Sequence, residues 1–286
     1  MGLRERIFAS VVVDIAIGLA AAVVLPAAAQ SPGVALVVDR VGAVSLGEAG
    51  ATRPVATLAV LPAGTRLQLE PASSLTLLYV ASGDEYTVSG PGGAQVDAAG
   101  VSTTQGAVAR RRAPGAAKPV QLRGDALAMG GVVMRSGGLR ARRPAGALTA
   151  PPELFAWEAF ARNDRYIVEL RDAAGAVVYE GRAQGLALPF PASITLKPQE
   201  RYTWSVTVVG DSALALTSGA SFTLAADDVR DEAKRVRPAE SAAFSDRLVY
   251  ALWLEQVGAV GEARQMWQAL AEQRPDDDAL TARARR

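Results

Sequence analysis

Short runs of alternating apolar and polar residues, separated by turns that contain glycine or proline, dominate the chain between Val34 and Leu224. This period-two alternation predicts strands buried on one face, and turns at such close spacing leave no room for crossover helices. After Leu224 the apolar residues recur every three or four positions, which is the helical period. The sequence therefore predicts a mainly β protein, with two all-β modules (a β roll or sandwich, then a sandwich) followed by a C-terminal α-helical hairpin.

The N-terminal segment has the layout of a secretory signal. Two arginines, an apolar run, and a proline followed by three alanines precede Gln30. We therefore expect 1–29 to be a signal peptide, cleaved after Ala29, and the protein to be periplasmic or extracellular. The alternative is a retained anchor at 7–25, which would place Asp14 in the membrane at a cost of about 2.5–3.5 kcal/mol. No later segment is long and apolar enough to suggest a transmembrane span in the mature chain.

The composition excludes several kinds of chemistry. The chain has neither histidine nor cysteine, which removes His-based triads, thiolate nucleophiles, zinc and iron–sulfur ligation, and disulfides. With 30 Lys+Arg against 29 Asp+Glu, it has no global basic field that would attract nucleic acid. Paired carboxylates remain possible catalytic groups, but the acidic clusters at 227–232 and 276–278 are expected to be solvated. We expect no enzyme, no cofactor and no metal site.

The first β module is expected at 30–102. Its predicted strands are 34–38, 55–60, 66–69, 75–80 and 85–88. A glycine-marked rhythm of apolar strand, turn and Tyr/Val strand runs through VGAVSL and then LPAGTRLQLEPASSLTLLYVASGDEYTVSGPGGAQV. The positions that carry it are Gly42, Gly64, Leu67, Leu69, Leu75, Leu77, Tyr79, Gly83, Tyr86 and Gly90. In this pattern the module resembles the β-rich periplasmic domain of FecR-type regulators. The resemblance implies a module that contacts a protein or senses a ligand and does not catalyse a reaction.

A linker rich in Gly, Pro and Arg, with additional strands, is expected at 103–150. Its first part, 103–119, has the composition of a loop and contains Arg110, Arg111 and Arg112. Either these arginines lie on a solvated loop, or they form a patch that binds an anionic polymer or lipid headgroups. A strand-like segment at 131–134 precedes a second basic stretch, made of Arg140, Arg142 and Arg143. If the two stretches lie close together, they would form one anion-binding surface.

The second β module is expected at 151–224. Its predicted strands are 154–157, 166–170, 176–179, 186–188, 202–208 and 221–224. Core positions are expected at Trp157, Tyr166, Val168, Leu170, Leu196, Tyr202, Trp204 and Val206. In the order and spacing of these positions the module resembles a fibronectin type III-like domain. The two tryptophans are expected in its core, and the alternative is a platform that stacks on carbohydrate.

The C-terminal part, 225–286, is expected to be helical. A polar helix at 225–235 precedes a longer helix that ends near Val257, a second helix at 262–273 and a last one from Ala279. Small, large, turn, small, aromatic and proline positions fall at Ala251, Leu254, Gly258, Ala263, Trp267 and Pro275. This order resembles a tetratricopeptide repeat, which implies that Leu252 and Glu255 face a partner. Alternatively, Leu252 belongs to the core. A single repeat cannot bury both its faces, so the hairpin either packs on the second β module or caps a partner's repeats.

These expectations combine into one functional hypothesis. The chain is expected to be an exported, non-catalytic cell-envelope protein that acts as a scaffold or protein-interaction module with an envelope protein partner. The alternative is a sensory protein whose β module binds a polymer or small ligand and signals to a membrane partner. An enzyme would need two carboxylates that converge in a cleft.

Overall fold

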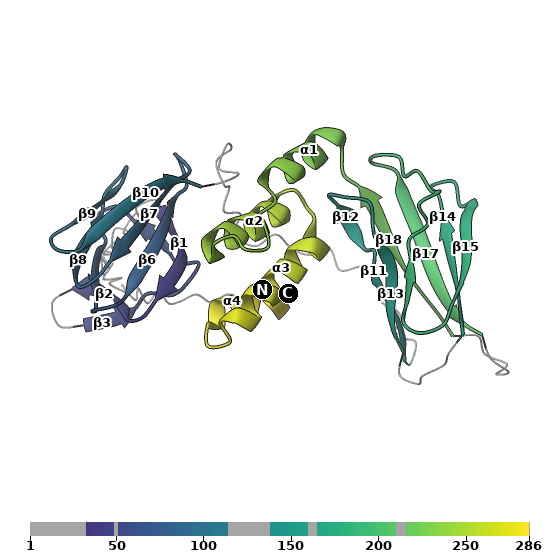
Figure 1. Ribbon diagram of the computed structural model, residues 1–286, viewed down its shortest axis with the longest axis horizontal. Coiled ribbons are helices and arrows are strands. Elements are labelled where there is room, and N and C mark those ends of the chain that lie inside the picture. Colours follow the sequence, from purple (N-terminus) through teal and green to yellow (C-terminus); the bar gives the residue numbers. More distant parts are fainter. Residues whose placement is uncertain (1–32, 49–50, 114–137, 160–164, 210–215, 286) are drawn as a thin grey trace, which may run out of the picture. The chain divides into compact units, whose positions relative to one another are not determined.

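The computed structural model describes residues 33–48, 51–113, 138–159, 165–209 and 216–285 (Figure 1). It confirms the expected fold class: the protein is mainly β, with several antiparallel sheets and four C-terminal helices. The expected strand at 131–134 lies outside the described residues, as does the whole N-terminal signal segment. Among the residues that the structure describes, no helix combines the length and the apolar character needed to cross a bilayer.

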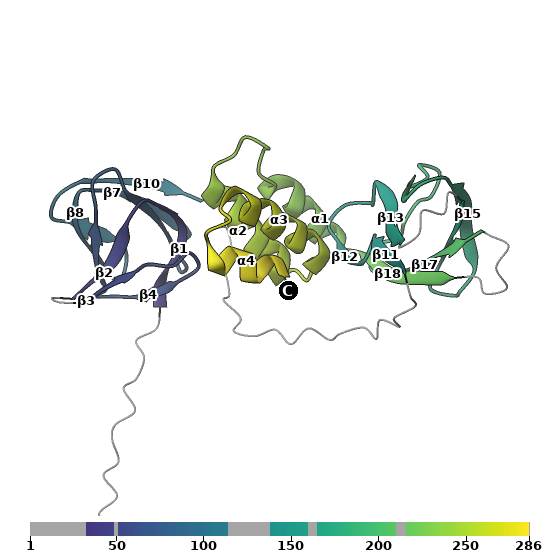
Figure 2. The ribbon, with the colours of Figure 1, turned by 90° about the horizontal axis from the view of Figure 1, so that it is seen from below.

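The first β module consists of two sheets that enclose a common core (Figure 2). One sheet has the order β10-β7-β6-β1-β4 and the other the order β3-β2-β5-β8-β9. Their strands are β1 (Gly33–Val41), β2 (Val44–Glu48), β3 (Ala51–Pro54), β4 (Val60–Pro62), β5 (Arg66–Leu69), β6 (Ser74–Tyr79), β7 (Asp84–Ser89), β8 (Gly92–Val96), β9 (Val101–Thr103) and β10 (Ala107–Arg112). Inward-facing residues of the two sheets, such as Val37, Leu67 and Leu77, fill the space between them.

Two of the local predictions for this module are wrong. The strand expected at 55–60 is a loop from 55 to 59, with a turn at 57–58 in which Leu58 has a φ of 65°, and strand β4 begins only at Val60. The loop expected at 103–119 contains strand β10, which adds an edge to the first sheet. All six residues of β10 are exposed, so its sequence has no apolar alternation by which it could be recognised.

The second β module also has two sheets, ordered β11-β13-β16 and β12-β18-β17-β14-β15. Their strands are β11 (Leu139–Arg143), β12 (Gly146–Leu148), β13 (Leu154–Ala159), β14 (Tyr166–Arg171), β15 (Val177–Ala183), β16 (Ala187–Pro189), β17 (Arg201–Val208) and β18 (Thr217–Leu224). Its core contains several aromatic rings. The ring centres of Phe155 and Trp204 are 5.2 Å apart, and those of Trp157 and Tyr166 are 5.1 Å apart. Both tryptophans are buried, so the core interpretation is confirmed and the carbohydrate platform is wrong.

The linker residues that precede the second module contribute to its sheets. Strand β11 pairs with β13, and strand β12 runs parallel to β18. The indole N–H of Trp204 donates to the carbonyl of Pro144, which lies between these two strands, at 2.8 Å. The described part of this module therefore begins at Leu139, earlier than the expected start at residue 151.

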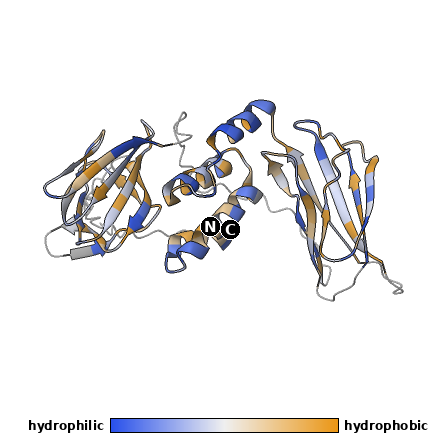
Figure 3. Ribbon diagram, viewed as in Figure 1, coloured by the Kyte–Doolittle hydropathy of each residue, from blue (hydrophilic) through white to orange (hydrophobic). Residues whose placement is uncertain are grey.

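The helices are α1 (Asp227–Val236), α2 (Phe244–Gln256), α3 (Val260–Gln273) and α4 (Asp278–Arg285). Helix α1 is hydrophilic along almost its whole length, with Ala233 and Val236 as its buried residues (Figure 3). Helices α2 and α3 form the expected hairpin around Gly258, whose φ of 81° suits a residue without a Cβ. The apolar positions of the repeat pattern, Ala251, Leu254, Ala263 and Trp267, are all buried.

One face of the first β module belongs to the core of the helices. Leu36 and Val38 of β1 and Leu78 of β6 point away from the interior of their own module and pack in one cluster with Leu248, Leu252 and other helical residues. Strand β1 is therefore buried on both faces. The apolar side of α2 is covered by the same chain, which supplies the second surface that a lone helical repeat needs.

Candidate functional site

Strands β7 and β10 carry Glu85 and Arg111 to the outer face of the first sheet. Tyr86 and Val88 point into the core of the module, so Glu85, on the alternate position, points to the opposite face. Arg111 is paired directly with Glu85 in the register of the two strands, and directly opposed residues share a face. The N-terminal turn of α2 brings Ser245 and Asp246 to the same place.

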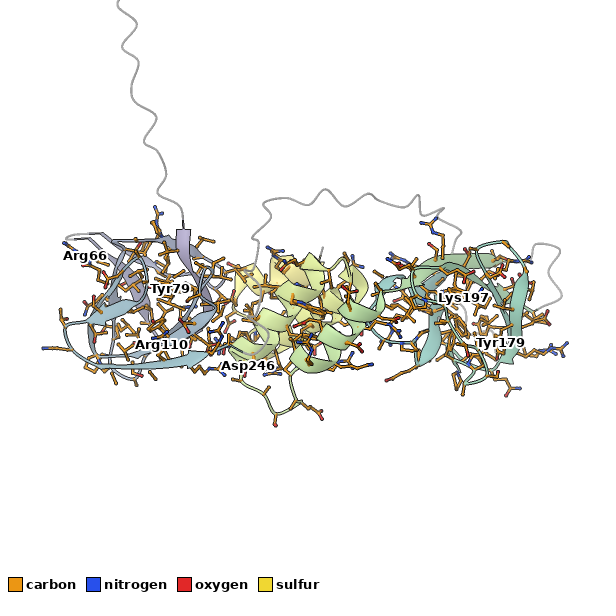
Figure 4. The ribbon with its side chains drawn as sticks, turned by 90° about the horizontal axis from the view of Figure 1, so that it is seen from above. Arg66, Tyr79, Arg110, Tyr179, Lys197 and Asp246 are labelled. Atoms are coloured by element: carbon orange, nitrogen blue, oxygen red, sulfur yellow. The ribbon has the colours of Figure 1, made fainter. Side chains whose placement is uncertain are left out.

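These four residues form a connected polar cluster, which we call the Arg111 junction. The guanidinium of Arg111 donates to Oε1 of Glu85 at 2.7 and 2.9 Å, to the carboxylate of Asp246 at 2.7 and 3.2 Å, and to Oγ of Ser245 at 3.0 Å. Ser245 in turn donates to Oε1 of Glu85 at 3.1 Å. One arginine thus joins a strand and a helix through two carboxylates (Asp246 is labelled in Figure 4).

Glu85 is the most deeply placed member of the junction. Only 2% of its side chain is exposed, and its Oε2 has no hydrogen-bond partner among the described residues. Burial raises the pKa of this carboxyl group, because the ionised form loses its hydration. The hydrogen bonds from Arg111 and Ser245 act in the opposite direction, and the charge of Asp246 adds to the increase. The junction therefore contains a carboxylate that is costly to keep ionised.

The neighbouring arginines of β10 have a different environment. Arg110, labelled in Figure 4, is 62% exposed and pairs with Asp84 at 2.8 Å. Its hydrogen bond holds the pKa of Asp84 below the usual range. Arg112 is also exposed, opposite Asp84 in the register. The predicted triplet is thus divided: Arg111 bonds to the buried Glu85 and to helix α2, whereas Arg110 pairs with Asp84 of its own sheet.

A second polar contact joins the helices to strand β1. Arg274, which follows α3, pairs with the carboxylate of Asp39 at 2.6 Å and donates to the carbonyl of Arg40 at 2.6 Å. The same guanidinium lies 4.0 Å from the ring centre of Phe244 at the start of α2. Together with the Arg111 junction, this contact flanks the apolar cluster around Leu36 and Val38.

A third polar contact joins the helices to the second β module. Both carboxylate oxygens of Glu262, in the first turn of α3, accept hydrogen bonds from Thr149: the backbone N–H donates at 2.7 Å and the hydroxyl at 2.5 Å. Thr149 is buried. Arg143 also donates to Gln265 of the same helix at 3.4 Å. The helices are therefore bonded to both β modules.

The two residues predicted from the helical repeat lie within the helices. Leu252 is 6% exposed and belongs to the helical core. Glu255 accepts a hydrogen bond from the indole of Trp267 at 2.9 Å and another from Arg283 of α4 at 2.7 Å. Both side chains have intramolecular contacts, and their role in binding a partner stays a prediction.

The two arginine stretches lie on strands of different sheets. Arg111 of β10 contacts α2, whereas Arg143 of β11 contacts α3. Arg142 pairs with Glu158 of β13 at 2.5 Å, within the second module. The contacts of the two stretches thus lead to different helices and do not bring the stretches together.

Sequence reasoning missed the residues that form the junctions, namely Glu85, Asp39, Asp246, Glu262, Arg274 and Thr149. One signal was available. Residues 34–38 form an unbroken apolar run where a strand with one solvated face would alternate. Such a run indicates burial on both faces, and hence a second layer against this strand.

Among the described residues, no group of three or more Asp or Glu side chains is arranged to hold a metal ion. Compared with known protein families and with curated proteins, the sequence matches none.

Proposed function

We propose that this chain is an exported, non-catalytic cell-envelope protein that acts as a scaffold or protein-interaction module. Its first β module would resemble the FecR-type periplasmic domain, its second module a fibronectin type III-like domain, and its helices a tetratricopeptide-like repeat. The signal-like N-terminus supports export. Binding would draw on surface burial and charge and would involve no bond chemistry.

The observation that carries this proposal is the use of the helices as an internal connector. The Arg111 junction bonds α2 to the first β module, and Glu262 bonds α3 to the second. Helices bonded to both β modules connect them through more than the linking chain. A protein that brings envelope components together would benefit from such a connection. The surface that we propose for a partner is the exposed edge at Arg110 and Arg112 of the first β module.

The test is affinity capture of the tagged full chain after mild cross-linking of whole cells. The informative variant is Arg110→Glu with Arg112→Glu, and the matched control is Lys197→Glu with Arg201→Glu, the same change of charge on the second module. We expect specific envelope proteins with the original chain and with the control, and their loss with the β10 variant. If the original chain captures no specific envelope protein, the scaffold proposal is wrong. If all three proteins capture the same envelope proteins equally, the partner binds at a site other than Arg110 and Arg112.

The sensory alternative is supported by the position of Glu85. This buried carboxylate lies where β7 meets α2, so a ligand that shifts β7 or β10 would also disturb the contact with the helices. The probe is alginate, an anionic polymer, added to the full chain while the hydrogen exchange of α2 is followed. Binding that weakens with salt, together with faster exchange in α2, would support a sensor. Binding with unchanged exchange would leave the polymer as a surface ligand only.

A further inference from the structure

Strand β15 is the open edge of the larger sheet in the second β module. Among the described strands β14 is its one hydrogen-bonded neighbour, and β15 ends the order β12-β18-β17-β14-β15. The strand contains no proline and, from Val177 to Glu180, its side chains are exposed or half-buried. Figure 4 shows Tyr179 at this outer edge of the module. An edge of this kind offers unpaired backbone N–H and C=O groups to another strand.

The charges on β15 lack partners within the described structure. Glu180 and Arg182 are both exposed on the outer face of the sheet, and neither forms an ion pair with a described residue. Directly opposite Glu180, on β14, is another acid, Glu169, whose carboxylate is already bonded to Arg171 at 2.6 Å. Like charges directly opposite each other destabilise a sheet. A cation on the open side of Glu180 would offset this repulsion.

A second copy of the same strand can supply such a cation when the two copies pair antiparallel. In an antiparallel pair of two β15 strands centred on Gly181, Glu180 of each copy lies opposite Arg182 of the other. The same register places Tyr179 opposite Ala183, and both of these side chains belong to the core-facing side of the sheet. A register centred on Glu180 would instead place two glutamates opposite each other. The charges therefore select the register centred on Gly181.

Exposed apolar residues lie close to the same edge. Val177 is 47% exposed, Val178 is 36% exposed, and Leu186, just after the strand, is 44% exposed. In the register centred on Gly181, the N-terminal end of one β15 runs alongside residues 184–186 of the other copy. Successive side chains of a strand point to opposite faces, so the one of these two valines that shares the face of Leu186 would be partly covered by it.

We propose that the partner of strand β15 is a second copy of this chain, and that two copies form one continuous sheet through antiparallel β15 pairing, with two reciprocal Glu180–Arg182 ion pairs. This inference does not depend on the proposed scaffold function. A strand pair of this length belongs to the small, weak class of interfaces, so association is expected at high protein concentration.

The test is sedimentation equilibrium of the purified full chain up to roughly millimolar concentration, which covers the weak range of affinities. Two variants reverse one charge each: Glu180→Arg makes the edge cationic, and Arg182→Glu makes it anionic. We expect each variant alone to associate about tenfold more weakly than the original chain, because both cross-strand pairs become repulsive. An equimolar mixture of the two variants should associate again, and so should the double variant. The controls are Arg182→Lys, which keeps the charge, and Lys197→Glu, which changes a remote exposed charge.

Loss of folding does not explain the expected result. Both residues are exposed, and Glu180→Arg places a cation opposite Glu169, which favours the monomer's own sheet. Hydrogen exchange gives a second measurement: the backbone amides of β15 that do not bond to β14 should be protected at high concentration in the original chain and unprotected in either single variant. A chain that stays monomeric at every concentration would overturn the proposal. So would single variants that associate as strongly as the original, or a mixture that fails to recover.

Discussion

Arg111 of β10 and Asp246 of α2, 135 residues apart in the sequence, are joined by hydrogen bonds of 2.7 and 3.2 Å. The arginine also holds Glu85, which belongs to the strand beside its own. An exposed ion pair contributes little to stability, but this arginine neutralises a carboxylate that is almost wholly buried. The stability of the contact between the first β module and the helices should therefore depend on Arg111 more than on either neighbouring arginine.

Replacing Arg111 with methionine should destabilise the protein by about 2–3 kcal/mol, because Glu85 would be left buried without a counter-charge. This loss of stability is smaller than for a fully buried ion pair, because 42% of the Arg111 side chain is exposed to solvent. The measurement is urea unfolding followed by far-UV circular dichroism. The matched variant is Arg110→Met, whose exposed pair with Asp84 should leave the unfolding midpoint almost unchanged. Equal effects of the two changes would contradict the assignment of the junction.

The pH dependence of stability should reveal Glu85. Its raised pKa means that the folded protein retains this proton at pH values where the unfolded chain, with the usual value near 4.5, has released it. This group therefore makes stability fall as the pH rises from about 4.5 through the raised pKa. In Glu85→Gln that contribution is absent, so the variant should gain stability relative to the original chain as the pH rises through this interval. The measurement is the unfolding midpoint across the acid range, with Glu240→Gln as an exposed control. A constant difference between the two proteins would refute the prediction.

Replacing Trp267 with alanine should lower the free energy of unfolding by roughly 3–5 kcal/mol, because a large buried ring is lost from the centre of the helices. Trp267→Phe should cost less, since it keeps a smaller aromatic ring in the core but loses the hydrogen bond to Glu255. Unfolding monitored through the helical signal measures both. Val260→Ala, at an exposed position of the same helix, serves as the control. An unchanged midpoint for the alanine variant would be incompatible with the packing of α3.

Replacing Glu262 with alanine should destabilise the contact of α3 with the second β module. The backbone N–H and the hydroxyl of buried Thr149 would both lose their acceptor, and a buried unpaired donor costs about 1–3 kcal/mol. Thermal unfolding measures the change, with Glu272→Ala on an exposed position of α3 as the control. If the two alanine variants unfold at the same temperature, the contact contributes no stability.

The elements that the sequence predicted well are those in which apolar spacing reports burial on one side. The alternation through Tyr166, Val168 and Leu170 marked strand β14, and the spacing of Leu248, Ala251 and Leu254 marked helix α2. In both cases the pattern follows from local geometry, since period two and period 3.6 each align one face with a core. The turn at Gly258 was also predictable, because it depends on the conformation of this one residue.

The features that could not be predicted depend on contacts between distant segments. Strand β10 has no apolar face and exists because β7 offers it a backbone edge. The bonds of Arg111 to Ser245 and Asp246 depend on the position of α2, which the local sequence of β10 does not encode. The same holds for Glu262, whose bonds to Thr149 join residues 113 positions apart in the sequence.

Strand β1 is buried on one face by its own β module and on the other by the helices, so it can be fully buried only after the helices have been synthesised. Arg274 donates to the carbonyl of Arg40, a residue 234 positions earlier, and the helices that cover Leu36 and Val38 are synthesised long after strand β1. At typical rates of synthesis this interval is on the order of 10–50 s. For that time the outer side of β1 has no cover from its own chain. The nascent protein thus exposes apolar side chains of β1, which can associate with other chains, until the helices have been synthesised.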